Sequence, residues 1–331
     1  MLVPTIKDIA KLAGVTFVSV SRALNNEPGV SEETRRKILD IAKQINYVPN
    51  LAAKRLVDRS SNGIGLIWPK REEPFFYRTC NQIQEEAAAR GFTVMVSFAE
   101  REEALRSFRE FFIGRAICWL DKRSTPEYTE AKEQFRGKVL EVGGRERWKQ
   151  ENAHWLDIDR KGAIKQAMSH LFELGHTRIA FLGGHSDKWL GYTESLVELG
   201  LEFSPELNVM TLVGNPDMPQ KVRDFVHNYS EYGATAIVID SEAMLREFVK
   251  TAYVEGVRIP EQLSVAVYDD VPETQSLLPI PITTVGPDIV GLARTIIDLI
   301  TVEADAAEEG LFFRKMIETE LKVRESTRQW G

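Results

Sequence analysis

The sequence predicts a small all-α head followed by an α/β body built from two doubly wound parallel-sheet lobes. Two short helical patterns joined by a glycine turn lie within residues 5–24, and from Gly63 onward apolar strand runs alternate with amphipathic helical patterns. Charge divides the chain in the same way. Residues 1–60 carry a net charge of +4 in a chain of net charge −7, so residues 61–331 carry −11.

The first helix of the head is marked by its ends and by its apolar face. Thr5 is a suitable N-cap, and Asp8 three residues later favours a helix start. Gly14 supplies the stop, because a left-handed C-terminal residue costs glycine little. The expected buried face consists of apolar residues at helical spacing, Ile6, Ile9, Ala10 and Ala13.

Two further helices are expected in the head. Thr16 caps a second helix, and a third begins at Ser31 and ends near Asn46. In the second helix three side chains point inward, Val20, Ala23 and Leu24. Four others stay available outside, Phe17, Val18, Ser21 and Arg22.

A helix, a glycine turn, an exposed helix and a supporting helix form the helix-turn-helix pattern, whose second helix enters the major groove of DNA. A helical bundle for protein contacts is the alternative. The basic charge of residues 1–60 favours a phosphate-bearing partner, so the sequence predicts that the head binds double-stranded DNA.

The body alternates strands with helices, which predicts parallel sheets covered on both faces. The expected strands are 64–68, 93–97, 116–120, 138–142, 178–182, 209–213, 236–239 and 263–268. The expected helices are about 78–90, 101–112, 126–135, 161–174, 188–199, 218–230, 242–255 and 287–302. The chain is expected to cross between lobes near 157–162 and 282–287, with a final strand at about 315–323 returning to the second lobe.

Several classes of function receive no support from the sequence. No apolar run approaches the roughly 20 residues of a membrane span. No signal region precedes the first helix, and Cys80 and Cys118 lie far apart, so we expect a cytoplasmic protein with reduced thiols. The histidines lack metal-ligand spacing and no nucleophile motif occurs. We therefore expect no metal, no cofactor, no membrane partner and no enzymatic activity.

Four short runs match one family. They are Thr5-Ile6-Lys7-Asp8-Ile9-Ala10, Ala13-Gly14-Val15-Thr16, Val20-Ser21-Arg22-Ala23-Leu24-Asn25 and Tyr47-Val48-Pro49-Asn50. In these runs the chain resembles the lactose/galactose-repressor (LacI/GalR) family of bacterial transcription regulators, and the similarity continues more loosely to about residue 325. The resemblance implies a DNA-binding domain at 1–48, a hinge helix and linker at 49–60, and a periplasmic-binding-protein-like effector-binding and dimerisation domain at 61–331. Lobe 1 is expected at about 61–158 and 285–310, and lobe 2 at about 159–284 and 311–331.

The resemblance also implies a hinge helix that orders on DNA. By that reading Leu56 is a minor-groove wedge, Ala53 permits close approach, and Lys54 and Arg55 face phosphate. A plain linker is the alternative. The full set of expected DNA-contacting residues is Thr5, Thr16, Phe17, Val18, Ser19, Ser21, Arg22, Asn25, Tyr47, Asn50, Ala53, Lys54 and Leu56.

Residues of an effector site in the cleft between the lobes follow from the same resemblance. The matching positions are Phe75, Phe76, Asp159 (with Asp157 second) and Asp269. Lys188 and Ser241 stand at effector-contacting positions where the family has Arg and Asn, and Asn215-Pro216 replaces a closing aromatic. Lys188 keeps the charge of arginine but not its planar fork. The alternative makes Lys188 a solvated surface charge and Asp157 with Asp159 a helix N-terminal pair.

The function implied is that of a repressor of carbohydrate uptake or catabolism genes, released from operator DNA by a sugar such as a galactoside. One alternative keeps DNA binding but replaces the sugar by a non-sugar corepressor or a protein partner. Another, from a different class, is a cytoplasmic sugar-binding protein without DNA control. No leucine-heptad tail follows the last strand, so a homodimer rather than a tetramer is expected.

Overall fold

The computed structural model describes residues 4–47, 62–120, 124–143, 154–184, 186–302 and 313–331. The chain divides into two units, Met1–Ser60 and Ser61–Gly331. The first unit has a small core of its own, and the second contains the larger buried clusters. Within the described residues, no helix has the length and apolar character needed to cross a membrane.

Residues 4–47, the described part of the first unit, contain three helices, α1 (Ile6–Ala13), α2 (Phe17–Leu24) and α3 (Glu32–Gln44). Ile9, Val20 and Ile38 come one from each helix, and all are fully buried. Gly14 ends α1 in the left-handed conformation at φ 71°. The helix-turn-helix head predicted from the sequence is therefore confirmed.

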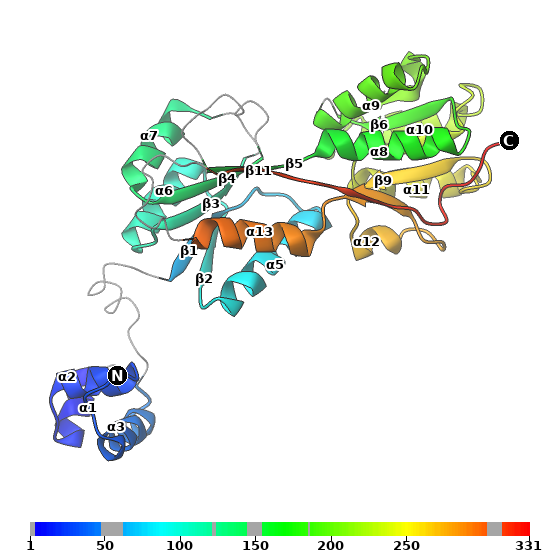
Figure 1. Cartoon of the computed structure of the whole chain (residues 1–331). Coiled ribbons are helices and arrows are strands. Elements are labelled where there is room, and N and C mark those ends of the chain that lie inside the picture. Colours follow the sequence, from blue (N-terminus) through cyan, green and yellow to red (C-terminus); the bar gives the residue numbers. More distant parts are fainter. Residues whose placement is uncertain (1–3, 48–61, 121–123, 144–153, 185, 303–312) are drawn as a thin grey trace. The chain divides into compact units, whose positions relative to one another are not determined.

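The second unit begins with a six-stranded sheet whose strands are all parallel (Figure 1). Its order is β11 (Arg314–Ile317), β5 (His154–Ile158), β4 (Lys138–Val142), β3 (Arg115–Trp119), β1 (Gly63–Ile67) and β2 (Thr93–Ser97). Helices α5 (Pro74–Ala89) and α13 (Ile289–Thr301) cover one face. Helices α6 (Arg101–Glu110) and α7 (Pro126–Phe135) cover the other.

A second sheet of six strands forms the other lobe. Its order is β12 (Glu320–Lys322), β10 (Thr283–Gly286), β9 (Ser264–Tyr268), β8 (Ala236–Ile239), β6 (Ile179–Gly183) and β7 (Asn208–Met210), with β12 antiparallel to β10. Helices α8 (Arg160–Glu173) and α9 (Asp187–Glu198) pack on one face. Helices α10 (Met218–Asn228) and α11 (Glu242–Val254) pack on the other, and a short helix α12 (Pro272–Gln275) follows β9.

The two sheets have the same strand order, because β2-β1-β3-β4-β5-β11 corresponds to β7-β6-β8-β9-β10-β12. In such sheets ligands bind at the carboxyl ends of the strands where the order reverses. That point lies between β1 and β3 in the first lobe and between β6 and β8 in the second. The two-lobed parallel-sheet architecture expected from the sequence is confirmed.

Three details differ from the expectation. The single final strand expected at about 315–323 is in fact two strands, since β11 pairs with β5 in the first lobe and only β12 joins the second. The chain crosses between lobes there (Figure 1), so one continuous strand cannot serve both sheets. Strands β5 and β10 lie at the other two crossings and were not expected as strands.

Candidate functional site

The second helix of the head exposes an apolar and basic surface. Phe17 is 59% exposed and Val18 is 43% exposed, although both are apolar. Arg22 is also exposed, whereas Ser19 and Ser21 are half-buried. The inward face consists of Val20 and Ala23, with Leu24 half-buried against them. This division matches the expected orientation of the helix.

The caps of the head hold its first two helices in place. The Thr5 backbone N–H and hydroxyl both donate to Asp8 Oδ2, at 2.8 and 2.7 Å. Thr16 Oγ1 accepts from the Ser19 backbone N–H at 3.2 Å. The Thr16 bond pairs a backbone N–H that the start of a helix leaves unpaired. The Thr5–Asp8 bonds fix the chain where it enters α1. Two expected DNA-contacting residues, Thr5 and Thr16, thus also have a structural role.

Arg35 has a role that the sequence reasoning did not anticipate. Its guanidinium donates to the carbonyl oxygens of Ala23 at 3.2 Å and of Glu27 at 2.7 Å. These carbonyls lie at the end of α2 and in the turn after it. Arg35 therefore links α3 to the end of the exposed helix. From the sequence, Arg35 contributes only to the basic charge of residues 1–60, and nothing in its position early in α3 indicates this contact.

The remaining expected DNA contacts lie at the edge of the head or beyond it. Tyr47 packs half-buried against the head core, and the Asn25 side-chain amide donates to Ser21 Oγ at 3.5 Å. The expected hinge contacts, Asn50, Ala53, Lys54 and Leu56, lie outside the described residues.

In the second lobe, Asp269 lies directly after β9 in a polar cluster. The residue is 8% exposed, and its Oδ1 has no hydrogen-bond partner within the described part of the chain. Burial raises the pKa of its carboxyl to about 6, while the nearby charges of Lys188 and Arg160 oppose this rise. Its backbone φ is 82°, in the left-handed region that few residues other than glycine adopt. A buried, unpaired acceptor on a strained backbone is typical of a ligand-binding position.

Lys188 reaches into the same cluster from α9. Its ammonium lies 3.9 Å from the ring centroid of Tyr268 and donates to the carbonyl oxygen of Asp240. The Tyr268 hydroxyl, like Asp269 Oδ1, is buried without a hydrogen-bond partner within the described ranges. Lys188 is therefore held inside the lobe by a cation–π contact and a carbonyl, and the reading as a solvated surface charge does not fit.

Three other expected positions act as helix caps or strand anchors. Asp159 Oδ1 accepts from the Gly162 backbone N–H at 2.8 Å and caps α8. Asp157, the second choice, accepts from the Arg160 guanidinium at 2.8 Å. Ser241 caps α11 through the backbone N–H of Met244 at 3.4 Å. These contacts support the helix-terminal reading of the Asp157 and Asp159 pair.

A cavity of about 820 Å³ lies at the carboxyl ends of β1, β2 and β3. Its first-lobe lining includes Trp68, Phe98 and Trp119, and Glu242 and Arg246 reach it from α11 of the second lobe. The site thus opens between the two lobes at the strand-order reversal of the first sheet. None of the six expected effector residues lines this cavity.

The expected aromatics stand next to the lining rather than in it. Phe76 contacts Trp68 and Trp119 edge-on, with centroid distances of 6.0 and 5.4 Å. Phe75 is 5% exposed and belongs to the buried core of the first lobe. Trp119 is the last residue of β3, and Trp68 directly follows β1. An aromatic residue at the carboxyl end of a strand is the sequence signal that could have identified both positions.

Charges on the cavity wall are balanced. Four lining residues are basic, Lys70, Arg71, Arg101 and Arg246. Four are acidic, Glu72, Glu73, Glu100 and Glu242. Arg71 pairs with Glu73 at 3.3 Å, and Arg246 pairs with Glu242. A wall of this kind, with the exposed Phe98 ring beside paired charges, suits a neutral ligand rich in hydrogen-bonding groups.

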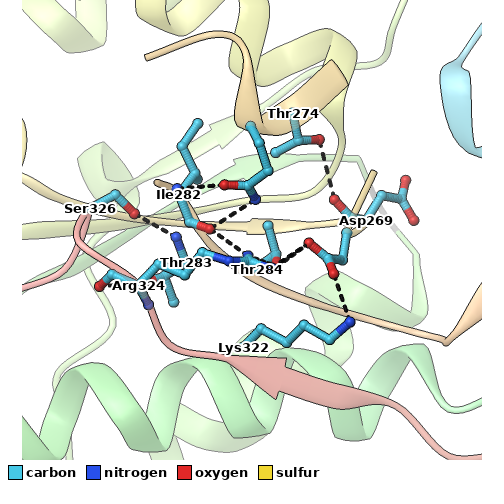
Figure 2. Close-up of polar contacts among 10 residues, drawn as sticks. Asp269, Thr274, Ile282, Thr283, Thr284, Lys322, Arg324 and Ser326 are labelled. Atoms are coloured by element: carbon cyan, nitrogen blue, oxygen red, sulfur yellow. Dashed lines mark hydrogen bonds and ion pairs between the residues drawn. The ribbon is translucent and has the colours of Figure 1, made fainter. Parts of the chain in front are cut away.

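Asp270, the neighbour of Asp269, is a structural anchor. Its Oδ1 accepts from Thr284 Oγ1 and from the Arg324 guanidinium, both at 2.9 Å. Its Oδ2 accepts from Lys322 Nζ at 2.8 Å. Figure 2 shows Lys322, at the end of β12, and Arg324, just after it, beside Thr284 of β10. The contacts join the two chain segments that leave and re-enter the second lobe.

Comparisons with known proteins match both units. Residues 5–50 match the family described as bacterial regulatory proteins, lacI family, and residues 168–327 match the periplasmic binding protein-like domain. The chain belongs to the LacI family of bacterial transcription regulators. The ribose operon repressor of Halalkalibacterium halodurans is 28% identical over 98% of this chain and 97% of its own.

Solved structures show the same fold. The Lac repressor dimer bound to operator and the anti-inducer ONPF has a TM-score of 0.83 at 21% identity, covering 99% of this chain and 100% of its own. The complex of the transcriptional regulator CelR with cellobiose has a TM-score of 0.69 at 24% identity, covering 98% and 99%. As a LacI-family member, the chain is a DNA-binding transcriptional regulator and not an enzyme, as expected from its sequence.

Proposed function

We propose that this LacI-family regulator represses genes of carbohydrate uptake or catabolism and leaves its operator when a neutral sugar binds between the lobes. The observation that carries the proposal is the buried Oδ1 of Asp269, an acceptor without a partner among the described residues; the buried Tyr268 hydroxyl also lacks one there. A sugar hydroxyl is a donor that would complete this site. The cavity adds apolar surface for the ring of a sugar, chiefly at Phe98, which is 52% exposed.

The name of the ribose operon repressor and the cellobiose in the CelR complex support a sugar as the ligand class. The balanced charges of the cavity wall support a neutral sugar over a phosphorylated one. A galactoside is one sugar within this class. We propose that the first-lobe cavity and the Asp269 cluster are two parts of one effector site, with Lys188 and Phe76 as supporting residues.

On the DNA side we propose that Arg22, with Phe17 and Val18, reads bases in the major groove, and that Thr5, Thr16, Ser19, Ser21, Asn25 and Tyr47 position the head. The exposure of the first three side chains supports this division. The hinge set, Asn50, Ala53, Lys54 and Leu56, completes the proposed contacts. A homodimer would present two such heads to a pseudopalindromic operator.

The decisive experiment begins with operator DNA selected from a random library by the full-length protein. Fluorescence anisotropy then measures operator affinity with and without each member of a panel of neutral mono- and disaccharides, and calorimetry measures sugar binding. We expect at least one sugar to bind and to lower operator affinity. Operator binding that no sugar alters, with no heat from any sugar, would contradict the proposal.

A second candidate is a regulator controlled by a non-sugar corepressor or a protein partner. The internal contacts of Lys188 favour it, since the ammonium is bound to Asp240 and Tyr268 and is not aimed into the large cavity. An effector that tightens operator binding, or operator control restored only by a cell extract protein, would support this candidate instead.

A further inference from the structure

The segment from Asp269 to Glu273 touches both lobes. It leaves β9 of the second lobe, and Asp270 anchors it there to Lys322. Two residues later in the chain than Asp269, Val271 is 1% exposed and lies in the buried cluster of the first lobe, together with Ile83 of α5. A second-lobe segment thus contributes a core side chain to the first lobe.

Glu273 at the start of α12 extends this contact with an ion pair. Its Oε2 and Oε1 accept from Arg78 Nε and Nη2 of α5, both at 2.7 Å. The two residues are 195 positions apart in the chain. The two parallel hydrogen bonds form the bidentate arrangement in which a guanidinium binds a carboxylate most specifically. The hydrogen bonds lower the pKa of Glu273 and raise the pKa of Arg78.

We propose that the Arg78–Glu273 pair is a latch that holds the two lobes in the arrangement seen here while the effector site is empty. The pair can do this because it joins a first-lobe helix to a second-lobe segment that also carries Asp269. The side chains are 39% and 36% exposed, so the latch is weak enough to open. A contact of this kind biases an equilibrium between two lobe arrangements without locking it.

The position of Glu273 explains how an effector would act on the latch. Glu273 lies only four positions after Asp269, whose backbone is held in the left-handed conformation. A ligand donor that binds Asp269 Oδ1 would shift this segment, and the segment carries Glu273 and Val271 against the first lobe. This regulatory meaning rests on the proposed function, whereas the latch itself is measurable without DNA or effector.

Electron–electron resonance distances between spin labels test the latch in the full-length protein. Labels are placed at Glu130→Cys on α7 and Val197→Cys on α9, both exposed, in a Cys80→Ser background. Excess unlabelled protein ensures that each oligomer carries one labelled chain. We expect Arg78→Ala and Glu273→Ala to raise the population with an altered interlobe distance, relative to the population with the native distance, about two- to fivefold. The exchange variant Arg78→Glu/Glu273→Arg should return it toward wild type.

Arg90→Ala is the matched control. Arg90 is the C-cap of the same helix and pairs with Glu86 at 2.8 Å and Asp298 at 2.6 Å, but all three belong to the first lobe. Its loss should leave the interlobe distance unchanged. Wild-type distances in both alanine variants, or an exchange variant as altered as the single ones, would overturn the latch. A panel without sugar binding would instead defeat the proposed function and leave these distances unaffected.

Discussion

Asp269 and Asp270 are adjacent in the chain, yet their carboxylates lie in opposite environments. Asp270 accepts hydrogen bonds from Thr284, Lys322 and Arg324, whereas Asp269 Oδ1 accepts none from the described residues. Burial raises the pKa of Asp269 to about 6. For Asp270 burial acts in the same direction, but the hydrogen bonds from Lys322 and Thr284 outweigh it and lower its pKa. One carboxylate thus keeps an unpaired oxygen among the described residues, and the other holds the fold.

Asp269→Asn should stabilise the unliganded protein at neutral pH. The folded-state pKa of Asp269 is about 6, above its usual value of 3.8, so ionisation costs stability as the pH rises through this range. The shift corresponds to at most about 3 kcal/mol at pH 8. Asparagine tolerates the left-handed backbone and carries no charge. We expect a Tm several degrees above wild type at pH 8.

The same measurement at pH 4 is the control for this prediction. Wild-type Asp269 is largely protonated there in the folded state, so the advantage of Asp269→Asn should shrink strongly. An advantage that is the same at pH 4 and pH 8 would contradict the assigned environment. Loss of any sugar response in this variant would add support for its proposed binding role.

Asp270→Asn should destabilise the second lobe. The variant loses the negative charge that faces Lys322 and Arg324, and charged hydrogen bonds of this kind contribute about 1.5–3 kcal/mol each. The folded-state pKa of Asp270 is lowered, so its contribution is present above pH 4 and is lost as the pH falls further. Urea unfolding at pH 7 should show the loss. Asp298→Asn, whose carboxylate is 55% exposed, should show little.

Arg22→Ala should weaken specific operator binding by about 1–3 kcal/mol, because the arginine that we propose reads a base is replaced by a side chain without donors. Binding to random DNA should weaken less, since that binding depends on total charge. Lys37→Ala removes one exposed positive charge from α3 and serves as the control. Anisotropy titrations at one salt concentration provide the comparison. An equal loss on random DNA would exclude base reading by Arg22.

Arg35→Ala should loosen the exposed helix of the head. Its guanidinium binds the carbonyls of Ala23 and Glu27, and each charged hydrogen bond contributes about 1.5–3 kcal/mol. Hydrogen exchange in the full-length protein should therefore be at least about tenfold faster in α2. Arg36→Ala, which removes an exposed neighbour, should leave these amides protected. Unchanged protection in Arg35→Ala would exclude the linking role.

Phe98→Ala should weaken sugar binding about three- to tenfold, because it removes apolar surface from the cavity. Phe203→Ala is a closely matched control: both side chains are 52% exposed, and Phe203 does not line the cavity. Calorimetry with the sugar found in the panel measures both. Equal affinities in the two variants would place the sugar away from this cavity.

Much of the fold could be predicted because the signals are local. Capping residues such as Thr16 and the turn at Gly14 act within a few positions, so the three head helices follow from spacing. Strand β5 was missed because its sequence, with His154 and Asp157, does not read as an apolar run. Its charged carboxylate is accommodated by Arg160, a contact that becomes visible only in the folded chain.

The effector site was predicted less well, for a related reason. Position in a family motif pointed to Phe75 and Asp159, but the fold buries Phe75 in a core and uses Asp159 as a helix cap. Trp68 and Trp119 line the cavity because β1 and β3 are neighbours in the sheet, although far apart in the chain. Strand order is a long-range property that spacing along the chain does not encode locally.

By itself the sequence determined the family, the helix-turn-helix head and the two parallel-sheet lobes, because caps, turns and apolar periodicity act over a few residues. Only the tertiary structure decided which of two adjacent aspartates is paired. Residues from β10 and from beyond β12 converge on Asp270 and leave Asp269 Oδ1 without a partner in the described chain. The environment of a carboxylate depends on such distant segments, since burial and charge act through space.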